Sequence, residues 1–458
     1  METIRTTLRD SKTARWFALG VVSFTMLCGY YLTDVMAPLK PMLEKELLWN
    51  STEYGFFTSA YGWFNVFLLM LILGGIILDK MGVRFTGKMA TIIMVVGTAI
   101  KYWAISTKSL DGMELFGMKM QVVVAGLGFA TFGVGVEVAG ITVSKIIVKW
   151  FKGKEMALAM GLEMATARMG TALALATSVP IANAFRSVSA PILVCLIMLC
   201  IGLIAFFFYT VLDKRLDASM QAVASSESEP EESFSLRDIF FIISNKGWWY
   251  IAILCVLFYS SVFPFLKYAS DLMVNKFNID PELAGTIPAM LPFGTMLLTP
   301  LFGSVYDRKG KGASIMIIGA ILLIFVHAMY SIPALRQVPV AIFLIIILGI
   351  GFSLVPSAMW PSVPKIIPEK QLGSAYALIF WVQNWGLMGV PLLIGWILDK
   401  YCIKGTHLVD GVEVPAYDYT IPMMVFTGFG ILALIFALLL KAEDRKKGYG
   451  LELPNIKK

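Results

Sequence analysis

Twelve long apolar stretches run along the chain, and they restrict the possible folds more than any other feature. Their approximate cores are residues 16–37, 54–78, 86–106, 118–148, 156–180, 188–212, 247–270, 283–306, 313–334, 338–364, 374–398 and 419–441. A helix needs about 20 apolar residues to cross a bilayer. Lipid offers backbone groups no partners, and the stretches are too long for barrel strands, so helices are expected. The sequence therefore predicts an all-α membrane protein with twelve transmembrane helices.

Composition points to the same class of protein. Hydrophobic residues make up 58% of the chain and charged residues 15%, and the mean hydropathy is +0.76. These values do not suit a water-soluble surface, so the lipid bilayer is the expected solvent. The five cysteines and two histidines show no metal-ligand or disulfide spacing. We therefore predict no enzyme activity, no metal site and no cofactor.

The distribution of basic residues predicts the orientation. Most of the 38 Lys and Arg residues lie in the terminal segments and in every second loop. Because basic loops stay on the cytoplasmic side, both termini are expected to be cytoplasmic. Topology explains the net charge of +7, so nucleic acid is not expected as a partner.

A short motif occurs twice, half a chain apart. The pattern Gly-x-x-x-Asp-(Lys/Arg)-x-Gly has its aspartates at Asp79 and Asp307, which are 228 residues apart, and each copy closes an apolar stretch. This repeat resembles the motif that follows the second span of each half in the major facilitator superfamily. The resemblance implies a secondary transporter built from two pseudo-symmetric six-helix halves.

The predicted halves are residues 1–213 and 247–458, each a six-helix bundle. Residues 214–246 between them are predicted to form a cytoplasmic linker, since residues 225–233 are acidic and poor in apolar side chains. The motif residues are expected to act as cytoplasmic gate elements that hold the halves in one state. They are Gly75, Asp79, Lys80, Arg84, Gly303, Asp307 and Arg308.

Two opposite charges are predicted to lie at similar depth near the middle of the membrane. Glu137 precedes the turn at residues 150–155 by thirteen residues, and Arg168 follows it by thirteen. At about 1.5 Å rise per residue, each lies roughly 20 Å from that turn on adjacent antiparallel helices. A charge there is costly unless it is paired or serves a substrate. The alternative is that the two charges form an ion pair that only holds the two helices together. We favour a substrate site.

An ordered set of motifs in both halves resembles a family within that superfamily, the animal lysosomal dipeptide transporters. The motifs include Tyr31-x-x-Asp34, residues 60–65, Glu137, residues 150–155, Ala167-Arg168, Val262-Phe-Pro-Phe265, Trp360-Pro361, Gln371-Leu-Gly373, Ala375-Tyr376 and Gln383-Asn384. The resemblance implies transport of dipeptides by alternating access, with Glu137 and Arg168 in the binding site. Such charges would clamp the ammonium and carboxylate ends of a small zwitterionic peptide.

Further residues of these motifs are predicted to contact substrate, with packing as the alternative for each. Aromatic and amide groups combine apolar faces with directed hydrogen bonds. The candidates are Asp34, Tyr61, Trp63, Asn65, Trp360, Gln383 and Asn384.

Two other functions remain open at this point. One is a proton-coupled organic-anion or sugar-acid carrier, in which Arg168 binds the anion and Glu137 the proton. The other is a non-transporting sensor or assembly partner on a transporter scaffold. A monomer is expected. Residues 1–15 carry no acidic dileucine signal, which favours a bacterial inner membrane or a plasma membrane over a lysosome.

Overall fold

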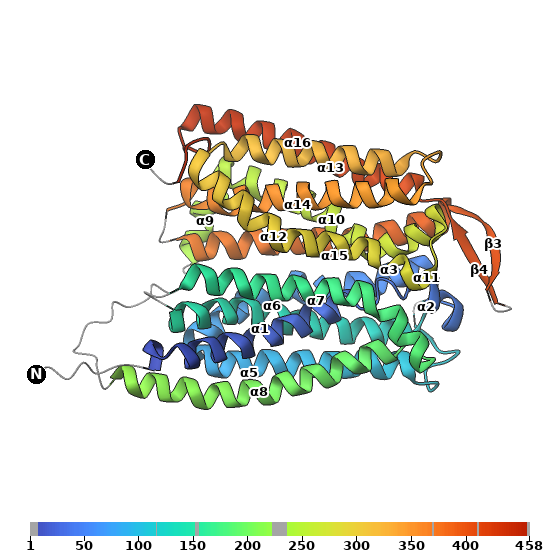
Figure 1. Ribbon diagram of the computed structural model, residues 1–458, viewed down its shortest axis with the longest axis horizontal. Helices are drawn as coiled ribbons and strands as arrows, with labels where there is room; N and C mark the ends of the chain where they lie inside the picture. Colours follow the sequence, from blue (N-terminus) through green and yellow to red (C-terminus); the bar gives the residue numbers. More distant parts are fainter. Residues whose placement is uncertain are drawn as a thin grey trace, which may run out of the picture.

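The computed structural model describes residues 8–115, 117–151, 155–221, 236–368, 371–409 and 412–455. Nearly all of these residues are helical, and the long helices lie side by side along one direction (Figure 1). Helix α1 (Lys12–Asp34) begins and α16 (Thr420–Lys447) ends at the same end of the bundle, named here the terminal end. The antiparallel strands β3 (Ile403–Val409) and β4 (Val412–Tyr417) project from the opposite end, named the hairpin end.

The helices form two groups, which Figure 1 shows as blue-to-green ribbons below and yellow-to-red ribbons above. With α1, the first group contains η1 (Leu8–Asp10), α2 (Lys40–Glu46), α3 (Ser51–Ser59), η2 (Ala60–Gly62), α4 (Trp63–Phe67), α5 (Met70–Ser106), β1 (Glu114–Leu115), β2 (Met118–Lys119), α6 (Met120–Phe151), α7 (Met156–Phe185) and α8 (Ala190–Gln221). With α16 and the hairpin, the second contains α9 (Leu236–Ile243), α10 (Lys246–Phe277), α11 (Pro281–Ala284), α12 (Thr286–Lys309), α13 (Gly312–Ser331), α14 (Val338–Ile366) and α15 (Leu372–Tyr401).

The all-α membrane fold is confirmed. Ten helices among the described residues are long and apolar enough to cross a membrane, and α7 is a further long helix at the predicted fifth span. Each predicted stretch is largely helical, and α5 covers both the end of the second stretch and the whole of the third. These two parts of α5 are separated by a kink at Gly82, whose φ of 74° is a conformation that glycine tolerates.

The second predicted stretch, residues 54–78, is interrupted rather than continuous. After α3, a 3-10 turn and the short helix α4 follow, and the chain leaves helical geometry at Leu69, with φ of 52°. The interruption lies where this segment contacts two neighbours closely. A Cβ at Gly62 would lie 3.2 Å from a backbone oxygen of α15, and one at Gly133 of α6 would lie 2.3 Å from the Tyr61 carbonyl oxygen. An apolar pattern records burial and carries no signal for such a break.

The segment between the two groups also differs from the prediction. Helix α8 continues to Gln221, beyond the predicted start of the linker at residue 214, and α9 lies within the predicted linker. Asp213 and Asp217 near the end of α8 pair with basic residues of α5 and α6, which ties this extension to its own group. The acidic core, residues 225–233, lies outside the described residues, and the boundaries of the two halves stay a prediction.

Buried charges join the two groups at the hairpin end. The Lys40 ammonium of α2 lies 2.6 Å from a Glu44 carboxylate oxygen and 2.9 Å from one of Asp271 in α10, and these side chains are at most 2% exposed. Tyr417 donates a hydrogen bond to Glu44, and Tyr419 donates one to Asp271. We name these five residues the hairpin-end network. Burial raises the pKa of Glu44 to about 7, and the negative charge of Asp271 adds to this rise, while Lys40 opposes it.

Helix contacts reinforce this connection between the groups. Asp399, near the end of α15, accepts hydrogen bonds from the backbone N–H groups of Ser51 and Thr52 at the start of α3. A carboxylate in that position satisfies donors that the first turn of a helix leaves unpaired. The two helices also approach closely through glycines, since a Cβ at Gly395 would lie 2.2 Å from the Ser51 carbonyl oxygen. The hairpin end is therefore held closed by charge and by backbone packing.

Candidate substrate-binding site

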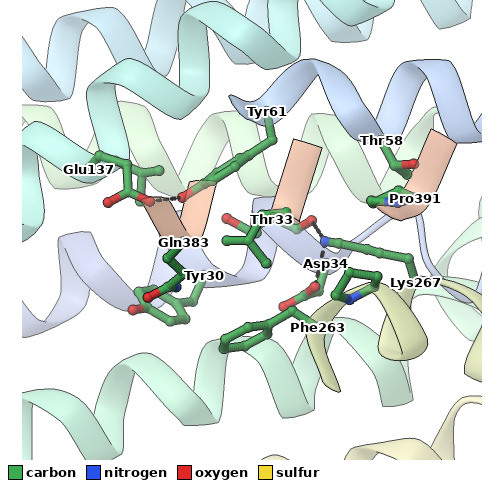
Figure 2. Close-up of a pocket in the computed structure, with 13 residues that line it drawn as sticks. Tyr30, Thr33, Asp34, Thr58, Tyr61, Glu137, Phe263, Lys267, Gln383 and Pro391 are labelled. Carbon is green, nitrogen blue, oxygen red and sulfur yellow. Dashed lines mark hydrogen bonds and ion pairs between the residues drawn. The ribbon is translucent and has the colours of Figure 1, made fainter. Parts of the chain in front are cut away.

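A pocket with a cavity volume of about 110 Å³ lies between the two groups of helices. Residues of α1, α3, η2 and α6 line it from one group, and residues of α10 and α15 line it from the other (Figure 2). The lining residues are Tyr30, Thr33, Asp34, Thr58, Tyr61, Val136, Glu137, Phe263, Pro264, Lys267, Gln383, Leu387 and Pro391.

Glu137 lies in this pocket and has one hydrogen-bond donor among the described residues. The Tyr61 hydroxyl donates to Glu137 Oε1 over 2.6 Å (Figure 2). Gly133, one helical turn before Glu137, allows the Tyr61 backbone to lie against α6. The close contact of η2 with α6 therefore places the hydroxyl beside the carboxylate. The second carboxylate oxygen keeps its capacity to accept from a ligand.

Arg168 of α7 lies beside the pocket in an aromatic setting. Its guanidinium carbon is 5.8 Å from the ring centroid of Tyr30 and 5.4 Å from those of Phe263 and Phe352. Tyr30 and Phe263 themselves line the pocket. Rings stabilise a cation through their faces but leave its hydrogen-bond donors free. Arg168 makes no ion pair with Glu137 in the described part of the chain, so pinning of the two helices by such a pair is not observed.

Asp34 lies in the pocket as predicted, but it is paired across the two groups. Its Oδ1 is 2.6 Å from the Nζ of Lys267 in α10, and the same ammonium donates to the Thr33 carbonyl oxygen. Figure 2 shows this pair toward one side of the pocket and the Tyr61–Glu137 hydrogen bond toward the other. The pocket therefore presents a carboxylate and an ion pair at separate positions.

Of the nine predicted contact residues, Asp34, Tyr61, Glu137 and Gln383 line the pocket. Arg168 lies beside it, as described above. The four remaining candidates are uncharged and lie elsewhere; they are Trp63, Asn65, Trp360 and Asn384. Trp63 donates to the Ser59 hydroxyl, and Trp360 donates to the Tyr259 hydroxyl and stacks on Phe380. Asn384 donates to a backbone carbonyl of its own helix, while Asn65 is fully buried with both side-chain polar atoms unpartnered. These four are not part of the pocket wall, so packing is the role that their positions support.

Lys267 is the main residue that the sequence-based site omitted. It was evident as a cation within an apolar stretch, which is itself a signal for function. Phe263 and Pro264 belong to the motif at residues 262–265, and both line the pocket. Tyr30, Thr33 and Phe352 carried no distinguishing pattern. Their roles depend on how α1 and α14 pack, and sequence spacing does not record that packing.

The gate-motif residues lie at the terminal end, and their recorded contacts stay within one group of helices. Asp79 pairs with Lys145 of α6 at 3.0 Å, and Arg84 pairs with Asp213 of α8 at 3.3 Å. In the second copy, Asp307 accepts a hydrogen bond from the Asn455 side chain. Lys80 and Arg308 are exposed, and a Cβ added at Gly75 or Gly303 would meet open space. Among the described residues, the ion pairs that join the two groups of helices lie at the hairpin end and in the pocket.

Asp213 anchors the first motif copy to the core of its group. It is fully buried, and it accepts hydrogen bonds from the Trp150 indole and the Tyr209 hydroxyl, each over 3.1 Å. Lys149 pairs with it at 2.8 Å. Within the described residues, no cluster of three or more His, Cys, Asp or Glu could hold a metal ion.

A largely apolar pocket that holds a few charged side chains, between two groups of membrane-spanning helices, is the arrangement of an integral membrane transporter. The chain belongs to the Major Facilitator Superfamily, whose family model matches residues 21–391 and 265–454. It is similar to the lysosomal dipeptide transporter MFSD1 of Mus musculus, with 27% identity over 406 residues that cover 86% of this chain and 82% of that protein. The resemblance inferred from the motifs is thereby confirmed.

Two solved structures share the fold. One is a bacterial homologue of the human lysosomal transporter Spinster, with a TM-score of 0.69 and 13% identity over 98% of this chain and 99% of that one. The other is the xylose transporter XylE from E. coli, with a TM-score of 0.68 and 15% identity over 93% of this chain and 96% of that one. At these identities the likeness concerns the fold alone.

Proposed function

We propose that this transporter carries small zwitterionic peptides, dipeptides in the first place, across the membrane by alternating access. The observation that carries the proposal is the pair of unmatched charges at the pocket. Glu137 has a free carboxylate oxygen, and Arg168 has a guanidinium that is held by rings and has no carboxylate partner within the described residues. The similarity to a protein named as a dipeptide transporter supports the same substrate class.

The physical fit is complementary at three points. Glu137 can accept from the ammonium of a peptide, and Arg168 can donate two parallel hydrogen bonds to its carboxylate. In the same pocket, Phe263 and Leu387 offer apolar surface, and Gln383 offers an amide that can pair with a peptide bond. A pocket that separates an anion from a cation favours zwitterions over sugars, which carry neither charge.

The proposed orientation places the terminal end in the cytoplasm. The excess of basic residues on that side supports it. Because the buried ion pairs close the hairpin end, this structure would then correspond to the inward-facing half of the transport cycle. Residence in a bacterial inner membrane or a plasma membrane stays a prediction, and the mouse relative is named as lysosomal.

Counterflow into proteoliposomes tests the proposal. Vesicles loaded with unlabelled Ala-Ala should accumulate labelled Ala-Ala without a pH gradient, and external dipeptides should compete while single amino acids and sugars should not. Glu137→Gln and Arg168→Ala should each abolish most exchange. Arg336→Ala removes an exposed arginine at the hairpin end and serves as the matched control. Normal exchange by both site variants would refute the site.

An organic-anion carrier is the second candidate, and the unpaired guanidinium of Arg168 is the observation that favours it. Such a carrier would exchange monocarboxylates or sugar acids, would require an imposed pH gradient, and would ignore dipeptides. Binding of dipeptides without any exchange, in protein shown to be folded, would instead support the non-transporting sensor.

A further inference from the structure

The Asp34–Lys267 ion pair is a contact that alternating access has to break. Asp34 belongs to α1 in the first group of helices, and Lys267 belongs to α10 in the second. Both side chains are largely buried, with exposed fractions of 5% and 12%. If the groups separate at the hairpin end, Lys267 leaves with α10. Asp34 would then be a carboxylate that has lost its cation, which is unfavourable where water does not fully replace that cation.

A second buried lysine contacts the same end of α1 from within the first group of helices. Lys101 of α5 is fully buried, and its Nζ lies 3.4 Å from the Leu32 carbonyl oxygen, two residues before Asp34. Its Nζ also lies 5.1 Å from the Phe57 ring centroid and 4.4 Å from that of Phe129. No carboxylate pairs with Lys101 in the described part of the chain.

The two lysines approach the end of α1 beside one aromatic ring. The Lys267 ammonium lies 6.0 Å from the Phe129 centroid, and the Lys101 ammonium lies 4.4 Å from it. Each also donates to a backbone carbonyl of this end of α1, Lys101 to Leu32 and Lys267 to Thr33. The end of α1 that carries Asp34 therefore contacts two lysines, one from its own group of helices and one from the other.

We propose that Asp34 exchanges Lys267 for Lys101 when the hairpin end opens, and that the released Lys267 then binds a carboxylate on the side chain of the substrate. The inference rests on the proposed function, because it adds a side-chain subsite to the same pocket. Lys267 lines that pocket together with Glu137, so a peptide held at Glu137 can present an acidic side chain to it. The exchange keeps Asp34 paired in both states.

Substrate selectivity tests the role of Lys267. Ala-Glu and Ala-Gln have nearly the same shape and differ in side-chain charge, so their uptake ratio isolates the carboxylate. Because a charged hydrogen bond is lost, Lys267→Gln should lower the Ala-Glu to Ala-Gln ratio roughly tenfold or more. Lys400→Gln, at an exposed lysine of the hairpin end, should leave the ratio as in the wild type. An unchanged ratio in Lys267→Gln, with dipeptide transport present, would overturn the subsite.

Distance measurements test the exchange without any substrate. Spin labels at Glu46→Cys and Tyr401→Cys, both exposed at the hairpin end, report its opening in nanodiscs by double electron–electron resonance. Half-buried Cys200 is replaced by Ser to restrict labelling. The measurement is made in the Lys40→Met background, where loss of that buried cation is expected to populate the open state. There Lys101→Met should reduce the open population, because Asp34 then has no second partner. Adding Asp34→Asn should restore opening, since an amide needs no cation.

The possible outcomes separate the two ideas. Normal opening in Lys101→Met, or failure of Asp34→Asn to restore it, would overturn the exchange. Lys101→Met replaces a buried ammonium by an apolar side chain of similar length, so a folded protein is expected, and monodisperse elution checks it. If the wild type carries no dipeptide, the proposed function fails, while the distance measurements still decide the exchange.

Discussion

Removal of Lys40 should shift the protein from the state closed at the hairpin end to the state open there. The Lys40 ammonium is the cation that Glu44 and Asp271 contact directly, at 2.6 and 2.9 Å, and none of the three side chains is more than 2% exposed. In Lys40→Met the two carboxylates stay buried together in the closed state. In the open state they separate, one with each group of helices, and gain water.

The size of this shift follows from the cost of breaking a buried ion pair, which is about 3 to 5 kcal/mol. Glu44 accepts a proton readily, since its pKa is already raised to about 7, and protonation offsets part of the cost. We therefore expect the lower end, about 3 kcal/mol, which is roughly a hundredfold change in the ratio of closed to open protein. A population that is about 99% closed would become about equally divided.

Spin-label distances between Glu46→Cys and Tyr401→Cys measure this change directly. A second, longer distance should appear in Lys40→Met and be weak or absent in the wild type. Lys108→Met, at an exposed lysine of the loop after α5, is the control and should retain the wild-type distribution. If Lys40→Met is folded and retains that distribution as well, the hairpin-end network does not hold the two groups together.

Three other perturbations have outcomes that the structure specifies. Gly395→Ala should favour the open state, because its Cβ would lie 2.2 Å from a backbone oxygen of α3, whereas Gly389→Ala meets open space and should change nothing in the same distance measurement. The raised pKa of Glu44 means that the closed state binds its proton more tightly than the open state, so the closed population should increase as pH falls through about 7. Glu44→Gln should remove this pH dependence. If the variant keeps the same pH profile, Glu44 is not its source. Asp213→Ala should lower the free energy of unfolding by roughly 2 to 3 kcal/mol, because charged hydrogen bonds are lost. Asp217 is partly exposed, so Asp217→Ala should lower it by less than about 1 kcal/mol. Equal losses in reversible unfolding would contradict the anchoring role of Asp213.

The candidate site was predictable where a charge is unusual for its surroundings. Glu137 and Arg168 stand out because charges are rare inside apolar stretches, and the structure places Glu137 in the pocket wall and Arg168 against Phe263 beside it. Tryptophan and asparagine carry no comparable signal. Trp360 and Asn384 are equally suited to packing or to substrate contact, and only their neighbours in space show that they lie outside the pocket wall.

The sequence by itself determined the membrane class, the helical spans and the repeated gate motif, because each depends on local pattern: the length of an apolar stretch, or the spacing of charges along one segment. The tertiary structure alone decided which distant charges meet. Lys40 and Asp271 are 231 positions apart, and Asp34 and Lys267 are 233 apart. No periodicity relates such residues, since their contact arises from the packing of two separate groups of helices. For the same reason, the break at Leu69 and the aromatic setting of Arg168 became evident only in the folded chain.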